Sequence, residues 1–243
     1  MVESPTIIEL IQNGTISPQM AATLWAAIDK RCSFVVVAVP RLAGKTTLMH
    51  ALLELLPASE PIHILSGDQA EMDRLKKTPK GGYLVVGEVS QAPVPHYIWG
   101  APVRRLFDTL SNGYSLATAL HASSLEETID VLCRGNGVPD EHASNIKLII
   151  YLQRFGSNPD DFWRRLSEIH EIERVENGRP VGRLLHRWDE KSGHFEVCED
   201  SVVLQITAEN LQVRASQLKQ MADSGQTSAR EVAKMVETSA KNL

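Results

Sequence analysis

Residues 33–47 read SFVVVAVPRLAGKTT, and this stretch decides the fold. Residues 33–39 form a short, unbroken run of mostly β-branched residues, which is typical of a strand buried on both faces of a parallel sheet. A loop follows at residues 40–44, and residues 46–56 then have the character of a helix that ends at Pro57. A buried strand that leads through a short loop into a helix predicts an α/β protein.

Strands and helices continue to alternate up to residue 133. The strands are expected at 62–65, 83–87 and 114–120, and the helices at 102–110 and 125–133, with a polar stretch at 69–80. This alternation predicts a mostly parallel sheet with right-handed crossovers. After Asn145 the pattern changes to strand-like runs joined by turns, among them the hairpin signal Asn177-Gly178. These runs are expected to extend the sheet as antiparallel strands, at 146–152, 164–173, 181–188 and 194–197.

Helices are expected at both ends of the chain. Two short ones precede residue 31, and two more follow Thr207, separated by Ser224-Gly225. The predicted organisation is a helical lead-in at 1–31, one α/β domain at 32–204 and a C-terminal helical segment at 205–243.

Composition excludes several classes of protein. Of the 243 residues, 43% are hydrophobic, which excludes a disordered chain, and the net charge of -5 argues against a nucleic-acid partner. The three cysteines include no CxxC pair, which argues against a disulfide framework or a Cys-rich zinc module. No apolar run approaches the ~18 residues of a membrane span, and the start lacks the order of a signal peptide. A cytoplasmic protein is expected.

The segment 39–47 is similar to the phosphate-binding loop G-x-x-x-x-G-K-[ST]. In that motif backbone N–H groups and a helix N-terminus point at phosphate oxygens. Lys45 would place its charge on the β- and γ-phosphates, and the Thr46 hydroxyl would bind Mg²⁺. The candidate nucleotide-binding residues are Pro40, Arg41, Leu42, Ala43, Gly44, Lys45, Thr46 and Thr47.

Val39 occupies the place of the first glycine of the motif. A β-branched residue tolerates positive φ badly, so Val39 is expected either to strain the loop or to reshape it. On this interpretation Val39→Gly would tighten nucleotide binding.

Two further polar residues follow buried strands. Glu88 ends the run Leu84-Val-Val-Gly87, and His121 follows residues 114–120. Ligands bind at the carboxyl ends of strands in open parallel sheets, so both side chains are candidates for catalysis. Each residue also has a structural alternative, since a strand-end acid can form a salt bridge and a histidine beside apolar strands can be a satisfied core residue.

Taken in order, these segments resemble one family, the type II and type IV secretion and type IV pilus traffic ATPases. Its apolar strand ending in Gly-Glu is similar to residues 84–89, and its histidine box, T-L-H-A-N-S-A-E-E, to residues 119–127. The family's acidic box is similar only at Asp68, with Glu71 nearby. The β-rich end of the family's domain is similar to the segment from Arg164 to Ile172, and the tail from Arg214 resembles its closing helices.

The chain also departs from the family. The segment after the acidic box looks shortened, and its arginines are largely missing. Because the loop begins near residue 39, a member without the family's separate N-terminal domain is expected. The resemblance therefore points to a minimal or degenerate member.

The resemblance implies a P-loop NTPase with a RecA-like, mostly parallel sheet that binds ATP and Mg²⁺. It implies Glu88 and His121 as catalytic residues, Thr46 and Asp68 as metal ligands, and a homo-oligomer, in this family a hexameric ring. It further implies a cytoplasmic chain that reaches the inner membrane through membrane-embedded platform proteins. Arg104 and Arg105 could contact a neighbouring subunit's phosphate or be surface arginines. Two alternatives are a non-hydrolysing structural or regulatory paralogue and a P-loop small-molecule kinase, for which no acceptor pocket is recognisable.

Overall fold

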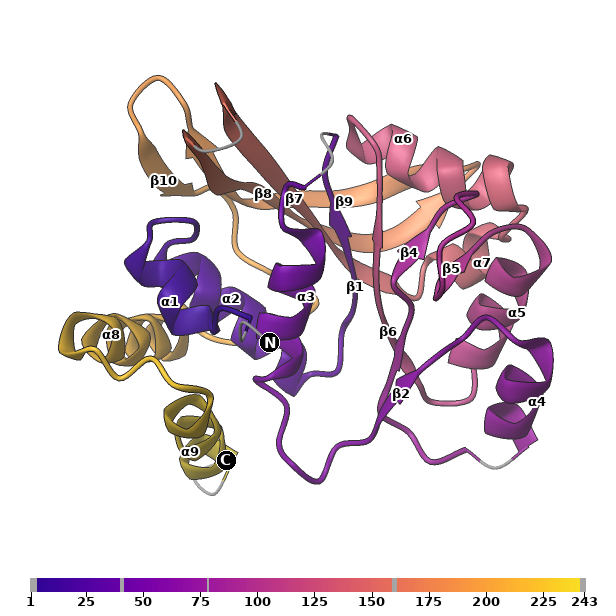
Figure 1. The fold of residues 1–243 in the computed structure, drawn as a ribbon, viewed down its shortest axis with the longest axis horizontal. Coiled ribbons are helices and arrows are strands. Elements are labelled where there is room, and N and C mark those ends of the chain that lie inside the picture. The colour runs from indigo at the N-terminus through magenta and orange to yellow at the C-terminus, as the bar shows by residue number, and fades with distance from the viewer. Residues whose placement is uncertain (1–3, 40–41, 78, 159–160, 241–243) are drawn as a thin grey trace.

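The computed structural model describes residues 4–39, 42–77, 79–158 and 161–240, and its centre is an eight-stranded sheet (Figure 1). The strand order is β10-β9-β8-β7-β1-β6-β3-β2. Five strands, β2, β3, β6, β1 and β7, are parallel to one another, and β8, β9 and β10 extend the sheet in antiparallel fashion. The strands of this sheet are β1 (Ser33–Val37), β2 (Ile62–Ile64), β3 (Tyr83–Val85), β6 (Ser115–Leu120), β7 (Ile146–Asn158), β8 (Asp161–Glu176), β9 (Arg179–Asp189) and β10 (His194–Val197). The predicted fold class is confirmed.

Helices cover both faces of the sheet, so β1 is buried on both sides as its sequence predicts. Phe34 and Val36 belong to one hydrophobic cluster, and Val35 and Val37 belong to the other. This alternation follows from the two-residue period of a strand. The helices are α1 (Ile7–Gln12), α2 (Pro18–Asp29), α3 (Lys45–Leu53), α4 (Gln69–Lys77), α5 (Ala101–Leu110), α6 (Leu125–Asp130), the π-helical turn η1 (Val131–Gly135), α7 (Asp140–Ala143), α8 (Ala208–Ser224) and α9 (Ala229–Ala240).

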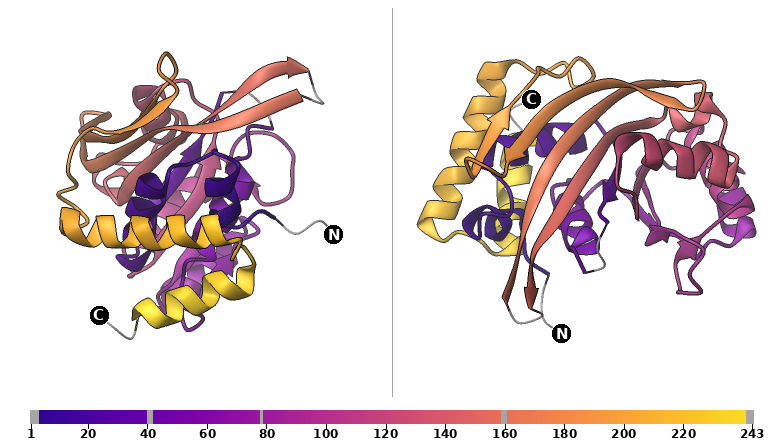
Figure 2. Two further views of the ribbon diagram at one scale, coloured as in Figure 1. Left: turned by 90° about the vertical axis from the view of Figure 1, so that its left-hand side faces the viewer. Right: turned by 90° about the horizontal axis from the view of Figure 1, so that it is seen from above.

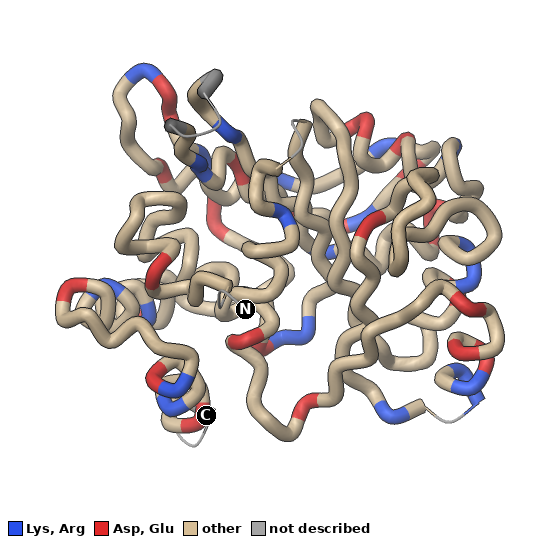
Figure 3. Tube along the Cα trace, viewed as in Figure 1, with Lys and Arg blue, Asp and Glu red and all other residues tan. Residues whose placement is uncertain are grey.

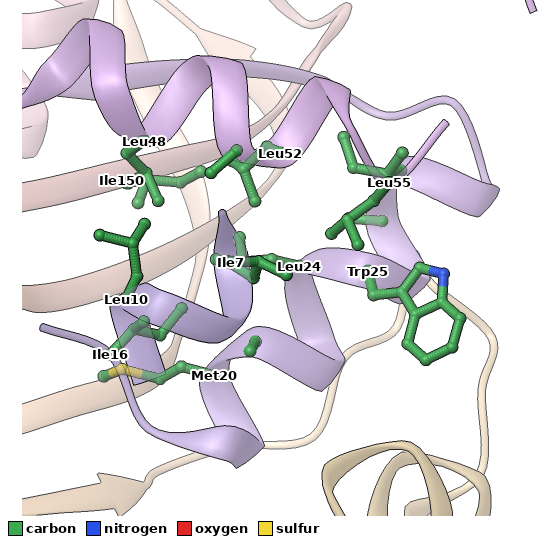
Figure 4. Close-up of a cluster of buried hydrophobic side chains, with 14 of the residues drawn as sticks. Ile7, Leu10, Ile16, Met20, Leu24, Trp25, Leu48, Leu52, Leu55 and Ile150 are labelled. Carbon is green, nitrogen blue, oxygen red and sulfur yellow. The ribbon is translucent and has the colours of Figure 1, made fainter. Parts of the chain in front are cut away.

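The larger cluster lies between α1, α2, α3 and the sheet (Figure 4). Leu48 and Leu52 of α3 point toward Ile150 of β7 and toward the side chains of the first two helices. Both of those helices start at caps visible in the sequence, because the Thr6 and Ser17 hydroxyls accept hydrogen bonds from backbone N–H groups of the first turn. This packing fixes α3, and with it the residues at its N-terminus.

The two ends of the chain pack against each other, with α8 lying beside α1 and α2 (Figure 2). Gln12 Nε2 donates to the Ala222 carbonyl at 2.6 Å, and Arg214 pairs with Asp29 at 2.5 Å. Gly225 ends α8 in the left-handed conformation, as its sequence position predicts. Within the described residues, no helix combines the length and the apolar character needed to cross a membrane.

One expectation was wrong, and one helix was not predicted. The run that begins at Ile146 was expected to be antiparallel, but β7 pairs in parallel with β1 and only its other edge is antiparallel to β8. The helices between β6 and β7 carry the chain across β1, so β7 returns in the same direction. The polar stretch at 69–80 contains the helix α4, which buries Met72, packs Leu75 against the smaller hydrophobic cluster and is polar at most other positions. Periodicity misses such a helix because it presents little apolar surface.

Candidate functional site

The predicted loop, the acid and the histidine meet at the carboxyl ends of the parallel strands. The chain leaves β1 into the loop and enters α3 at Lys45, while His121 directly follows β6. Glu88 lies beyond β3 and begins β4 (Glu88–Val89), which pairs with β5 (Tyr97–Ile98) as a small separate sheet. A cavity of about 450 Å³ is lined by residues 42–47, Glu88 and His121, together with Tyr97 and Arg164.

Lys45, Glu88 and His121 form one contact group beside this cavity. Lys45 Nζ lies 2.7 Å from His121 Nε2 and 3.2 Å from Glu88 Oε2, and the two latter atoms are 3.6 Å apart. The side chains of Lys45 and Glu88 are only 9% and 8% exposed, whereas that of His121 is 35% exposed. A buried ammonium and a buried carboxylate compensate each other's loss of solvation in this arrangement.

The hydrogen bonds of His121 indicate which ring nitrogen carries the proton. Nδ1 lies 2.8 Å from the Ala38 carbonyl oxygen, which can only accept, so Nδ1 is assigned as the donor. Nε2 is then the acceptor for the Lys45 ammonium at 2.7 Å. A neutral His121 therefore links the end of β1 to the lysine of the loop.

The N-terminus of α3 has the properties of an anion site. Gly44 precedes it with a φ of +95°, and no described side chain caps the first N–H groups. Unpaired N–H groups and the positive end of the helix dipole both favour a bound anion. Thr46 is exposed in the first turn and Thr47 is half-buried, while Pro40 and Arg41 lie outside the described residues.

Of the two expectations for Val39, strain at this residue is not observed, whereas a reshaped loop remains consistent with the structure. The described non-glycine residues with positive φ include Leu42, at +63°, and do not include Val39. Since β1 ends at Val37, Val39 lies before the turn of the loop, and Leu42 makes that turn instead. Among the described residues of the loop, Leu42 is the non-glycine residue with left-handed strain, and it is 76% exposed.

Asp68 lies apart from the group. Its Oδ1 accepts a hydrogen bond from Ala70 N at 3.0 Å, at the start of α4, and Asp68 is not among the described residues that line the cavity. The neighbouring Glu71 accepts from Ser66. Across the described ranges, no cluster of three or more His, Cys, Asp or Glu side chains is arranged to hold a metal ion.

The arginines of α5 make contacts within the chain. Arg105 pairs with Asp73 and Asp108, and Arg104 Nη1 donates to the Asn136 carbonyl at 2.7 Å. These contacts favour the interpretation of both as surface arginines.

Sequence analysis missed one basic residue of the cavity. Arg164 comes from β8 and its Nη2 donates to the Leu42 carbonyl at 3.1 Å. The run of two aromatic residues and two arginines at 162–165 was a signal for a basic surface, but the pairing that brings it to the loop is long-range.

Comparison with known proteins gives distant similarities. No family model matches the chain. An uncharacterized protein of Methanocaldococcus jannaschii, MJ1287, is 28% identical over 233 residues, in a match that covers 83% of this chain and 82% of that protein.

Several solved structures also resemble this chain. All three described here are ATPases. The VirB11 ATPase of the Brucella suis type IV secretion system, in complex with sulphate, is 18% identical, with a TM-score of 0.43 over 61% of this chain. The ATPase DotB of Legionella pneumophila is 14% identical, with a TM-score of 0.39 over 87% of this chain, and DotB of Yersinia pseudotuberculosis is 12% identical, with 0.39 over 89%. This chain spans 50%, 63% and 60% of their respective lengths.

Proposed function

We propose that this chain binds and hydrolyses ATP and is a relative of the secretion and pilus motor ATPases. The observation that carries the proposal is the contact group of Lys45, Glu88 and His121 beside a cavity that the N-terminus of α3 lines. The three residues come from segments far apart in the sequence, and each follows a strand of the same sheet.

The residues present fit a nucleotide with its phosphates on the loop. The uncapped N–H groups of α3 and the Lys45 ammonium supply positive charge, and the cavity of about 450 Å³ lies within the usual range for small-molecule sites. Bound phosphate would draw Lys45 away from Glu88 and His121, because a polyphosphate carries more negative charge than the single Glu88 carboxylate and the His121 imidazole is neutral.

A magnesium ion would be held by the Thr46 hydroxyl and the nucleotide's own oxygens. The exposed hydroxyl in the first turn of α3 fits this role, whereas Asp68, engaged at the start of α4, does not contribute to the site as described. When bound, the ion would neutralise charge that develops on the phosphates.

Glu88 is proposed to activate the attacking water. Once Lys45 turns to the phosphates, the Glu88 carboxylate can accept the proton that water loses as its oxygen bonds to the terminal phosphorus, leaving ADP and phosphate. His121, hydrogen-bonded to the end of β1 and to Lys45, would respond to the presence of the terminal phosphate.

Assembly and location follow from the same proposed relationship. We propose a homo-oligomer, in the form of a hexameric ring, that works in the cytoplasm and docks on membrane-embedded platform proteins of a secretion or pilus system. The second candidate is a non-hydrolysing nucleotide-binding paralogue, which the exposed, left-handed Leu42 in the loop favours.

Steady-state hydrolysis of ATP with Mg²⁺ tests the proposal. Wild type is expected to turn over, and Glu88→Gln is expected to slow turnover about 10²- to 10⁴-fold, the range for loss of a general base. Glu209→Gln, an exposed acid on α8, is the matched control and should leave the rate unchanged. Equal rates for wild type and Glu88→Gln would exclude Glu88 as the base, and ATP binding without turnover in wild type would favour the paralogue.

A further inference from the structure

Arg164 reaches the nucleotide loop from a strand more than a hundred residues further along the chain. Its Nη2 and Nε lie 3.1 and 3.4 Å from the Leu42 carbonyl oxygen. A Cβ added at Gly44 would lie 3.1 Å from Arg164 Cδ, so the arginine packs directly against the residue before Lys45. It lines the same cavity as residues 44–47.

Arg164 has a second arginine directly opposite. In the β7–β8 ladder its register partner is Arg154, and both guanidinium groups lie over the ring of Phe162, at 4.6 Å for Arg164 and 5.3 Å for Arg154. Like charges opposite one another destabilise a strand pair. An anion bound beside Arg164 would offset its repulsion from Arg154.

The polar contacts of Arg164 leave its charge uncompensated. Among the described residues its hydrogen bonds go to the Leu42 carbonyl, and no carboxylate lies within salt-bridge distance of it. Partial burial and the nearby Arg154 both lower the pKa of Arg164 below its usual value, which is consistent with a cation that has no anionic neighbour among the described residues. Figure 3 shows the basic positions along β7 and β8.

Arg165, the next residue, is placed differently. Its guanidinium lies 4.6 Å from the ring of Trp163 and 5.8 Å from that of Trp188, and its Nη1 donates to the Arg164 carbonyl at 2.9 Å. Arg165 is not among the described residues that line the cavity, so it packs on aromatic rings while Arg164 contacts the loop.

We propose that Arg164 is a ligand for the phosphate chain of the nucleotide, supplied by the same chain that carries the loop. A guanidinium presents several N–H donors in a plane and matches phosphate oxygens better than an ammonium does. The same contact would tie the β7–β8 hairpin to the loop when nucleotide binds. This inference rests on the proposed function, since it assigns a further residue to the same site.

Calorimetric affinities for ATP, ADP, AMP, adenosine and inorganic tripolyphosphate test the proposal. Arg164→Ala is expected to weaken ATP, ADP and tripolyphosphate about 10- to 100-fold, since a hydrogen bond to a charged group is lost. AMP should weaken less and adenosine not at all. Arg164→Lys should restore part of the loss, and Arg165→Ala should leave all five affinities at the wild-type values.

Three results would overturn the inference. An unchanged ATP affinity in Arg164→Ala excludes contact with the nucleotide. An equal loss for adenosine and ATP means that Arg164 contacts the base instead of the phosphates. If wild type and Lys45→Ala both fail to bind ATP, the proposed function fails as well. If ATP binding depends on Lys45 but not on Arg164, only the present inference fails. If Arg164→Ala does not fold, Arg164→Lys and Arg164→Gln carry the same comparison.

Discussion

Two glutamates of this chain are buried in different ways. Glu171 of β8 is fully buried and accepts hydrogen bonds from the backbone N–H groups of Val202 and Val203, at 3.0 and 3.2 Å, and from the Ser201 hydroxyl. Its contacts fasten the sheet to the segment that leads into α8. Glu88 is almost as buried, but its neighbours are the side chains of Lys45 and His121, which both line the cavity.

The difference separates a structural acid from one that chemistry can use. Fixed backbone donors hold a carboxylate in one state, because leaving them unpaired would be costly. A carboxylate held by a lysine that can turn to another anion is released when that anion binds. Burial alone therefore does not indicate function, and the nature of the partners does.

Replacement of Glu171 should have the largest effect on stability. Glu171→Ala leaves two backbone N–H groups and a hydroxyl without an acceptor and removes one of the two acids beside Arg183, whose Nε lies 3.7 Å from Glu171 Oε1. The expected loss is about 3–5 kcal/mol in the free energy of unfolding, the range for breaking a buried charged pair. Urea unfolding measures it.

The matched control is Glu173→Ala. Glu173 also pairs with Arg183, but its side chain is 31% exposed, so a loss below about 1 kcal/mol is expected. Equal losses for the two variants would show that the hydrogen bonds from backbone N–H groups to Glu171 do not contribute to stability.

Acid should lower the free energy of unfolding through His186 of β9. Burial lowers its pKa from 6.5 to about 4, and its Nε2 lies 2.8 Å from the Thr23 hydroxyl. Because the folded-state pKa is the lower one, His186 contributes stability above pH 6.5, and this contribution is lost as the pH falls toward 4. One pKa unit corresponds to about 1.4 kcal/mol, so the whole effect is about 3 kcal/mol.

Unfolding free energies at pH 7 and pH 4 measure this effect. His186→Gln keeps a hydrogen-bonding partner for Thr23 but does not titrate, so it should lose less stability than wild type over this range. The same loss in both proteins would assign the acid sensitivity to other groups.

The smallest effects are expected in the loop. Leu42→Gly relieves about 1–2 kcal/mol of left-handed strain, offset by about 0.5–1 kcal/mol of added unfolded-chain entropy. Stability should change little, and ATP binding should tighten a few-fold.

Val39→Gly has no such strain to relieve, so it should lower stability by about 0.5–1 kcal/mol and leave ATP affinity unchanged. Calorimetric titrations measure both ATP affinities. If Val39→Gly tightened ATP binding and Leu42→Gly did not, Val39 would be the residue that weakens the loop, as the motif predicts.

Local patterns were enough to predict much of the fold and the centre of the site. The β-branched run of β1, the Gly-Lys-Thr step into α3 and the polar residues after two strands are each encoded within a few residues. Parallel topology then brings Lys45, Glu88 and His121 to one edge without further information.

The remaining features depend on contacts that sequence spacing does not reveal. The direction of β7 depends on how its crossover packs, and α4 is mostly polar. Arg164 joins the site through strand pairing more than a hundred residues away from the loop. The conformations of Val39 and Leu42 depend on where the loop turns, which a motif with one altered position does not specify.

Calorimetric titration of ATP into wild type and Lys45→Ala, in the presence of Mg²⁺, tests the central claim most directly. The claim is that Lys45 leaves Glu88 and His121 to bind phosphate. Wild type should bind ATP at one site per chain, and Lys45→Ala should bind more weakly by about 1.5–3 kcal/mol, which is more than tenfold in the dissociation constant. Equal affinities, or no binding by wild type, would contradict the account.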